Sequence, residues 1–142
     1  MKRENIGFLS IVGQVTPATL LAVTDDLHPP RKLGRSRVGL ARVTGDSMRP
    51  TLLPGDRLLV RYGARVRPGD LVLARFPDGV LSVKRVDERR LLRDGTNGWW
   101  LLSDNPHVGI DSRHRGPVSA EAVAGVVLLR VWPRPTRLRD LA

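Results

Sequence analysis

The chain has no cysteine among its 142 residues. Disulfides, thiolate metal sites and a cysteine nucleophile are therefore excluded, and nothing in the sequence requires an oxidising compartment. Aromatic residues make up only 4% of the chain, so its core must consist mainly of Val, Leu and Ala. A chain of this length suffices for one domain that buries roughly two thirds of its unfolded surface.

Lysine is scarce as well, with 3 Lys against 21 Arg. Lys2 and Lys32 lie in the polar N-terminal region, whereas Lys84 lies inside the apolar run VLSVKRV (80–86). Arginine cannot act as a base in a protein, but lysine loses its proton when it is desolvated. A lysine in an apolar run of a chain that otherwise uses arginine indicates a chemical role.

The net charge of +10 favours contact with nucleic acid, anionic lipid or an acidic partner. The charge is spread along the chain, with local clusters at RKLGRSR (31–37) and DERRLLR (87–93), and no aromatic residues are interleaved with a basic stripe. We therefore interpret it as a solvated basic surface and expect no specific nucleic-acid partner. A basic nucleic-acid-binding β-barrel without enzymatic activity is the alternative.

The N-terminal region contains an apolar stretch, residues 6–23, that is long enough to span a bilayer if it is helical. Pro17 and several polar residues interrupt it, which weakens both the helix and its insertion. We expect residues 1–37 to form an N-terminal segment and polar linker, loosely ordered or membrane-associated. The predicted location is cytoplasmic, with membrane association through residues 6–23 as the alternative.

From Val38 onward, short β-type runs alternate with Gly, Pro and Asp. They are VGLARVTG, DRLLVRYG, DLVLARF, VLSVKRV, WWLLS and AVAGVVLLRVW. No long amphipathic helix is visible. The pattern predicts a mainly β domain over residues 38–133, a coiled antiparallel sheet or partly open barrel, followed by a basic C-terminal tail at 134–142.

Turn motifs between the runs support the prediction of a mainly β domain. The motif PGD occurs at 54–56 and 68–70, where Gly supplies the positive φ of a turn that leads into a strand. Asp78-Gly79 predicts a two-residue type I′ hairpin between two of the strands.

A candidate nucleophile lies in GDSMRPTLLPGD (45–56). Ser47 occurs in a glycine-containing, non-helical stretch, where a hydroxyl can face a cleft and backbone N–H groups can meet an oxyanion. Taken alone, a serine in such a loop is usually a turn residue, and only a partner base makes it a nucleophile.

Lys84, 37 positions downstream, is the candidate base. On a strand, Val80, Ser82, Lys84 and Val86 share one face. Burial among valines lowers the pKa of a lysine, and a fall from ~10.4 to roughly 7–8 makes it a competent base near neutral pH. The alternative is a lysine that extends to water from a strand edge. Together the two residues predict a serine endopeptidase that needs no cofactor.

Four segments, GDSMRPTL, RPGDLVL, VKRV and SDNPHVGIDSRHRGPV, resemble in this order the motifs of the type I signal peptidase family. The resemblance covers residues 42–131 and implies the fold of signal peptidases and LexA-like C-terminal domains. It implies that Ser47 is the nucleophile, that Lys84 is the general base, and that the Ser47 N–H belongs to the oxyanion hole. Residues expected to support the oxyanion hole and the dyad are Gly45, Asp46, Met48, Arg85, Asp104, Asp111, Ser112 and Arg113.

Two glycines depart from the family pattern. Gly45 stands where some members carry a serine that helps the oxyanion hole. Gly109 stands where many members carry a serine that orients the lysine. The orientation of Lys84 is therefore left to another group, with Ser82 and Ser112 as candidates.

Within the family, the GWWLLSDNP run (98–106) and the weak N-terminal apolar stretch most resemble maturation proteases of nickel superoxide dismutase. The resemblance implies a precursor protein with an N-terminal leader as the partner. A general type I signal peptidase at the membrane is the first alternative.

A LexA-like self-cleaving regulator is the next alternative. It requires an upstream Ala-Gly or Cys-Gly bond and a helix-turn-helix, and residues 1–46 contain neither. His107, Asp111 and His114 lie close in sequence but match no metal-ligand spacing, so no metal is expected.

Overall fold

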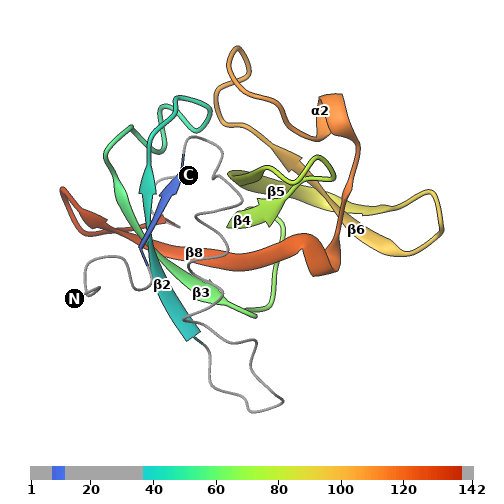
Figure 1. The fold of residues 1–142 in the computed structure, drawn as a ribbon, viewed down its shortest axis with the longest axis horizontal. Helices are drawn as coiled ribbons and strands as arrows, with labels where there is room; N and C mark the ends of the chain where they lie inside the picture. The colour runs from blue at the N-terminus through green and yellow to red at the C-terminus, as the bar shows by residue number, and fades with distance from the viewer. Residues whose placement is uncertain (1–7, 12–36, 139–142) are drawn as a thin grey trace.

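A computed structural model describes residues 8–11 and 37–138, which form a single nine-stranded sheet with very little helix (Figure 1). The strands are β1 (Phe8–Ile11), β2 (Arg37–Val43), β3 (Arg57–Tyr62), β4 (Leu71–Arg75), β5 (Leu81–Leu91), β6 (Asn97–Leu102), β7 (Val118–Ser119), β8 (Val123–Trp132) and β9 (Thr136–Arg137). The helical elements are α2 (Ser112–Arg115) and the 3-10 turn η1 (Ala120–Ala122). Each predicted β run from Val38 onward corresponds to one strand.

The sheet runs in the order β1-β2-β3-β8-β4-β5-β6-β7, and β9 pairs with β8. All neighbouring strands are antiparallel except β1 and β2, which are parallel. The long strand β8 pairs with β3 and with β4, so it joins the two halves of the sheet (Figure 1). The predicted mainly β class with a coiled, open sheet is confirmed.

Two apolar clusters fill the structure, one on each side of β4 and β5. The first contains Leu73, Leu81 and Val83 with residues of β2, β3 and β8. The second contains Val72, Ala74 and Val86 with Trp99 and Leu101 of β6. Because both faces of β5 are covered between Leu81 and Val86, a lysine in this segment is kept from water on either face.

The two PGD turns form as predicted. Asp56 N–H donates to Leu53 O (3.0 Å), and Asp70 N–H donates to Arg67 O (3.1 Å). Gly55 and Gly69 have φ values of 96° and 91° at the third position of these turns, a conformation that favours glycine.

The hairpin between β4 and β5 differs from the predicted type I′ turn on Asp78-Gly79. Gly79 N–H donates to Phe76 O (2.8 Å), so Pro77 and Asp78 are the central residues of the turn. A second bond, from Phe76 N–H to Val80 O (2.8 Å), closes a three-residue loop that ends in Gly79 at φ 84°. Proline locks its own φ at a negative value, so the turn begins at Pro77, and only the glycine takes a positive φ that the hairpin requires.

The basic segment DERRLLR (87–93) continues β5 beyond the core as far as Leu91. Its arginines lie over aromatic rings of β6: Arg89 is 5.0 Å from the Trp99 ring centroid and Arg90 is 3.8 Å from that of Trp100. Cation–π contacts of this kind contribute about 0.5–1 kcal/mol each at exposed sites, so part of the positive charge stabilises the hairpin.

The ends of the chain are described only in part. Within the predicted N-terminal segment (1–37), Phe8–Ile11 forms β1, whereas most of the apolar stretch 6–23 and of the linker lies outside the described residues. Within the predicted tail (134–142), Thr136–Arg137 forms β9, and Leu138 is buried in the first apolar cluster. In the described part of the chain, no helix is long and apolar enough to cross a membrane.

Candidate active site

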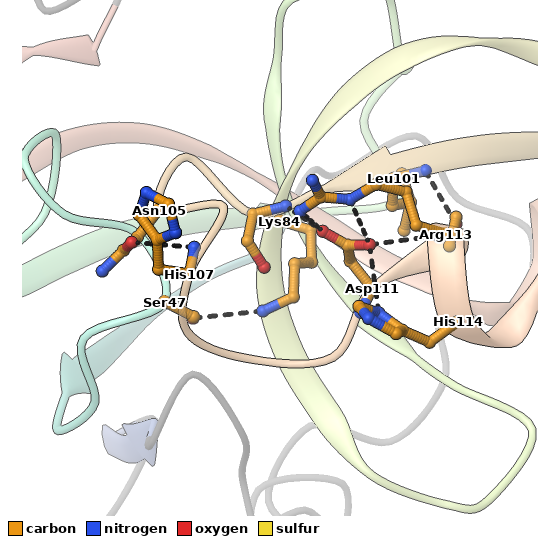
Figure 2. A network of polar contacts seen from close by, with 10 residues as sticks. Ser47, Lys84, Leu101, Asn105, His107, Asp111, Arg113 and His114 are labelled. Carbon is orange, nitrogen blue, oxygen red and sulfur yellow. Dashed lines mark hydrogen bonds and ion pairs between the residues drawn. The ribbon is translucent and has the colours of Figure 1, made fainter.

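Ser47 and Lys84 meet in the interior of the protein (Figure 2). Ser47 lies in the turn that follows β2, and Lys84 lies in the buried half of β5. Lys84 Nζ donates a hydrogen bond to Ser47 Oγ (3.1 Å). Both residues are almost fully buried, with 4% of Ser47 and 1% of Lys84 exposed. The structure thus brings together the two residues that the sequence paired across 37 positions.

The surroundings of Lys84 are mainly apolar. Lys84 pairs with Val72 of β4, and Val86, two residues further along β5, belongs to the same apolar cluster as Val72. Burial lowers the pKa of Lys84 to about 8, although the nearby carboxylates of Asp111 and Asp104 oppose the shift. Strand pairing therefore desolvates this amine enough to bring its pKa close to neutral.

The loop that carries Ser47 is fixed by hydrogen bonds from Asn105 and by the burial of Met48. Asn105 N–H donates to Ser47 O (2.9 Å), and Asn105 Nδ2 donates to Asp46 O (3.2 Å). Met48 is buried in the first apolar cluster, and its carbonyl accepts the Leu52 N–H (2.9 Å). In the described part of the chain the Ser47 N–H has no acceptor, so it is free to meet an oxyanion.

A second set of contacts joins β5 to the loop after β6. The Arg85 guanidinium donates to both carboxylate oxygens of Asp104 (2.8 Å each) and to Gly69 O (2.9 Å). Thr51 Oγ1 donates to the same carboxylate (2.5 Å). A bidentate arginine fixes a carboxylate in orientation as well as position, so Asp104 ties the Ser47 loop to the strand that carries Lys84.

Asp111 is the N-cap of α2 and also binds the loop after β6. Its fully buried carboxylate accepts hydrogen bonds from Ser103 N–H (2.8 Å), Arg113 N–H (3.0 Å) and the Arg113 guanidinium (2.8 Å). Burial raises the pKa of Asp111, but these bonds outweigh it and lower the pKa to about 2. Asp111 therefore stays ionised beside Lys84 at any pH at which the protein works.

The supporting residues predicted from the sequence thus surround the dyad: Asp46, Met48, Arg85, Asp104, Asp111 and Arg113 all make the contacts above, and Gly45 lies in the bend before Ser47. Ser112 Oγ is occupied differently, because it accepts the Leu101 N–H (2.9 Å). The catalytic and oxyanion roles of all these residues remain predictions.

Both histidines of the described residues, His107 and His114, make hydrogen bonds within their own loops. His114 Nδ1 accepts the Asp111 N–H (3.4 Å) and completes the capping box of α2. His107 N–H donates to Asn105 Oδ1 (3.2 Å), within the loop that touches Ser47.

Two residues that fix the Ser47 loop, Asn105 and Thr51, were not predicted from the sequence. Asn105 lies in the SDNP segment (103–106), directly after Asp104. An amide in a loop next to a carboxylate is the one feature of the sequence that could have indicated its role. Its partners, the carbonyls of residues 46 and 47, lie 59 positions or so away, and only the fold places them in reach.

Gly109 touches the nucleophile. Its φ is +93°, and a Cβ added there would lie 2.7 Å from Ser47 Cβ. Any side chain at this position is therefore strained by the backbone and collides with Ser47. A serine cannot occupy position 109 in this chain without displacing the nucleophile.

We predict that Gly109→Ala destabilises the protein by about 2–3 kcal/mol, since it combines a left-handed backbone with a steric clash. Thermal unfolding measures the loss. Gly95→Ala is the matched control, because Gly95 has a similar φ of +81° and no atom within 4 Å of the added Cβ. Equal losses in the two variants would show that the contact with Ser47 adds nothing.

Comparison with known proteins agrees with this geometry. Residues 12–126 match the family described as Peptidase S24-like. The chain is 30% identical over 91 residues to the LexA repressor of Exiguobacterium, covering 60% of this chain and 44% of that protein. It is 33% identical over 111 residues to mitochondrial inner membrane protease subunit 1 of Xenopus tropicalis, covering 63% and 66%.

The corresponding subunit of Schizosaccharomyces pombe is 27% identical over 113 residues, covering 65% of this chain and 72% of that protein. The chain therefore spans less than half the length of the LexA repressor that it matches. These similarities support the coarser part of the predicted resemblance, kinship with Peptidase S24-like proteins and with the mitochondrial inner membrane protease subunit. None of them bears on nickel superoxide dismutase.

Proposed function

The chain belongs to the Peptidase S24-like family, and from that premise we propose that it is a serine endopeptidase that removes an N-terminal leader from a precursor protein. The observation that carries the proposal is the buried hydrogen bond between Ser47 Oγ and Lys84 Nζ. An amine with a pKa near 8 beside a hydroxyl is a general base beside a nucleophile.

In the proposed reaction, Ser47 Oγ bonds to the carbonyl carbon of the scissile peptide while neutral Lys84 takes the hydroxyl proton. The Ser47 N–H stabilises the oxyanion. Collapse of the tetrahedral intermediate breaks the carbon–nitrogen bond, and Lys84 returns the proton to the leaving amine. Water then attacks the acyl-enzyme, with Lys84 again as the base.

Apolar side chains beside the dyad favour a substrate with small or apolar residues near the cut. Val108 and Ile110, which flank Gly109, are 45% and 41% exposed. Gly109 lies against Ser47, so these two residues belong to the segment of chain that passes the nucleophile. An extended peptide laid across them would bury apolar surface at about 25 cal/mol per Å².

The precursor that we propose is that of nickel superoxide dismutase, in the cytoplasm. Its support is the sequence resemblance of the GWWLLSDNP run (98–106) and the N-terminal stretch. The similarity to mitochondrial inner membrane protease subunit 1 supports the alternative, a general leader peptidase at the membrane.

Incubation with candidate precursors tests the proposal. The purified protein is mixed with a nickel superoxide dismutase precursor or with a secretory pre-protein, and the new N-terminus is read by mass spectrometry. We expect one cut at the leader junction of the first precursor. A cut in the second precursor alone would reassign the substrate, and cleavage of neither would contradict the endopeptidase activity proposed here.

The match to LexA repressor favours a second candidate, self-cleavage. The one Ala-Gly bond, Ala124-Gly125, lies in the middle of the sheet, where Gly125 pairs with Tyr62 and with Leu73. A bond held between two strands cannot reach Ser47. We therefore expect the protein alone to stay intact at pH 9, and specific fragmentation there would favour the LexA-like reading.

The rate should depend on pH through Lys84. The base is active when it is neutral, that is, above its pKa of about 8. We therefore predict that kcat/KM rises about tenfold per pH unit below pH 8 and levels off above it. A pH–rate profile with a fluorogenic peptide measures this. A rate already constant at pH 6 would be incompatible with Lys84 as the base.

A further inference from the structure

Ser103 carries a buried hydroxyl with no hydrogen-bond partner. In the described residues, only the Ser103 and Tyr62 hydroxyls are buried in this way. A buried hydroxyl without a partner has lost its hydrogen bonds to water and gained none in return, so it is rare in folded proteins and calls for an explanation.

Strand register places Ser103 directly opposite Lys84. Arg85 pairs with Leu102, the last residue of β6, so the next pair in this antiparallel register is Lys84 with Ser103. Residues directly opposite in an antiparallel pair project from the same face of the sheet, with Cβ atoms about 4.5–5.5 Å apart. The Ser103 side chain therefore projects from the face of the sheet that carries the Lys84 amine.

Gly109 gives an independent measure of where the Ser103 hydroxyl lies. A Cβ added to Gly109 would be 2.7 Å from Ser47 Cβ and 3.3 Å from Ser103 Oγ. Ser103 Oγ is therefore at most about 6 Å from Ser47 Cβ. The hydrogen bond from Ser103 N–H to Asp111 (2.8 Å) fixes the backbone that carries it.

We propose that Ser103 is the positioning residue of Lys84, and that its Oγ accepts a hydrogen bond from the lysine ammonium that forms when Ser47 gives up its proton. This inference rests on the proposed function. The buried ammonium carries three N–H donors. Ser103 Oγ is a buried acceptor without a partner, opposite Lys84 when the strand register is extended by one residue. The proposed bond stabilises the charged amine and holds it for the return of the proton to the leaving group.

In the resting structure Lys84 Nζ donates to Ser47 Oγ, and Ser103 Oγ accepts nothing. The proposed bond therefore forms through a rotamer change of one side chain during proton transfer. Of the two serines considered from the sequence, only Ser82 remains a rival for this role. Ser112 Oγ is occupied by Leu101 N–H, and Ser82 stands two residues before Lys84 on the same strand, opposite Ala74 of β4.

NMR titration tests the proposal without any substrate. The chain has 3 lysines, so ¹³Cε-labelled lysine gives a spectrum in which Lys84 can be assigned by comparison with Lys84→Met. Removing an acceptor that stabilises the ammonium lowers the pKa of Lys84. We expect Ser103→Ala to lower it by about one unit, since a hydrogen bond to a charged group contributes about 1.5–3 kcal/mol.

Ser82→Ala is the matched control, a buried serine on the same face, and we expect it to leave the pKa of Lys84 unchanged. In a peptide assay, Ser103→Ala should lower kcat about 10–100-fold and shift the acid limb of the pH profile to lower pH. An unchanged Lys84 titration in Ser103→Ala, or a shift in Ser82→Ala instead, would overturn the assignment.

The experiments distinguish a failure of the proposed endopeptidase function from a failure of the role proposed for Ser103. If the wild-type protein cleaves no precursor, the proposed function fails, but the titration still reports whether Ser103 contacts Lys84. If the wild type cleaves and Ser103→Ala has unchanged kinetics and titration, only the role of Ser103 is lost.

Discussion

Replacing Lys84 by Met is expected to lower kcat/KM by about a hundredfold to ten-thousandfold and, at the same time, to make the protein more stable. Without the amine no group takes the proton of Ser47, and general bases commonly contribute 10² to 10⁴ in rate. The stability should rise because methionine fills a similar volume in an apolar site and carries no charge.

The size of the stability gain follows from the pKa of Lys84, which falls from 10.5 to about 8. Folding disfavours the protonated amine by about 3 kcal/mol, of which the lost bond to Ser47 offsets about 1, leaving about 2 kcal/mol. The penalty is present in full below pH 8, shrinks as the pH rises toward 10.5, and is absent above it. The melting temperature of Lys84→Met should therefore exceed that of the wild type most clearly below pH 8.

Lys84→Arg complements this variant, because arginine keeps the charge but cannot act as a base. It should be as inactive as Lys84→Met without the gain in stability. Wild-type turnover in either variant would eliminate Lys84 as the base, and a destabilised Lys84→Met would contradict the desolvation argument.

Replacing Ser47 by Ala is expected to lower kcat/KM by at least about a thousandfold, with little change in the fold. The variant removes the atom that would form the acyl-enzyme, while the loop remains anchored by the Asn105 N–H, which donates to the backbone of residue 47 and not to its side chain. Thermal unfolding should change by no more than about 1 kcal/mol, the value of one hydrogen bond.

Ser119→Ala is the matched control for this variant. Ser119 precedes η1 and makes no side-chain cap hydrogen bond, so its loss should leave both activity and stability unchanged. Mass spectrometry of the wild type with a serine-acylating peptide should show one adduct, on Ser47. Persistence of activity or of the adduct in Ser47→Ala would place the nucleophile elsewhere.

The strands were predictable because local pattern determines them. Alternating and continuous apolar runs broken by Gly, Pro and Asp corresponded to β2, β3, β4, β5, β6 and β8. The β4–β5 hairpin differs from the predicted type I′ turn because Pro77, whose φ is fixed at a negative value, is the first central residue of the turn. The parallel pairing of β1 with β2 was not predicted, since parallel strands carry no turn signal between them.

The two main members of the site were predictable from the sequence, and so were several residues around them, such as Asp104 and Asp111, but other supporting residues were not. Ser47 and Lys84 stood out as a serine in a turn and a lone lysine among valines. The other supporting residues did not stand out, namely Asn105, Thr51 and Ser103. The role of a polar residue in a loop depends on its contacts, and only the fold determines those. Gly109 illustrates the same point: the sequence showed a missing serine, and the contact with Ser47 explains why none fits.

The β class, the absence of thiol chemistry and the pairing of one serine with one lysine follow from residue type and spacing, which are properties of the chain. The burial of the amine, its distance of 3.1 Å from the hydroxyl and the nearby serine without a partner follow from the folded arrangement of the strands. Burial and distance depend on which strands become neighbours, and in this sheet the neighbours are often far apart in sequence.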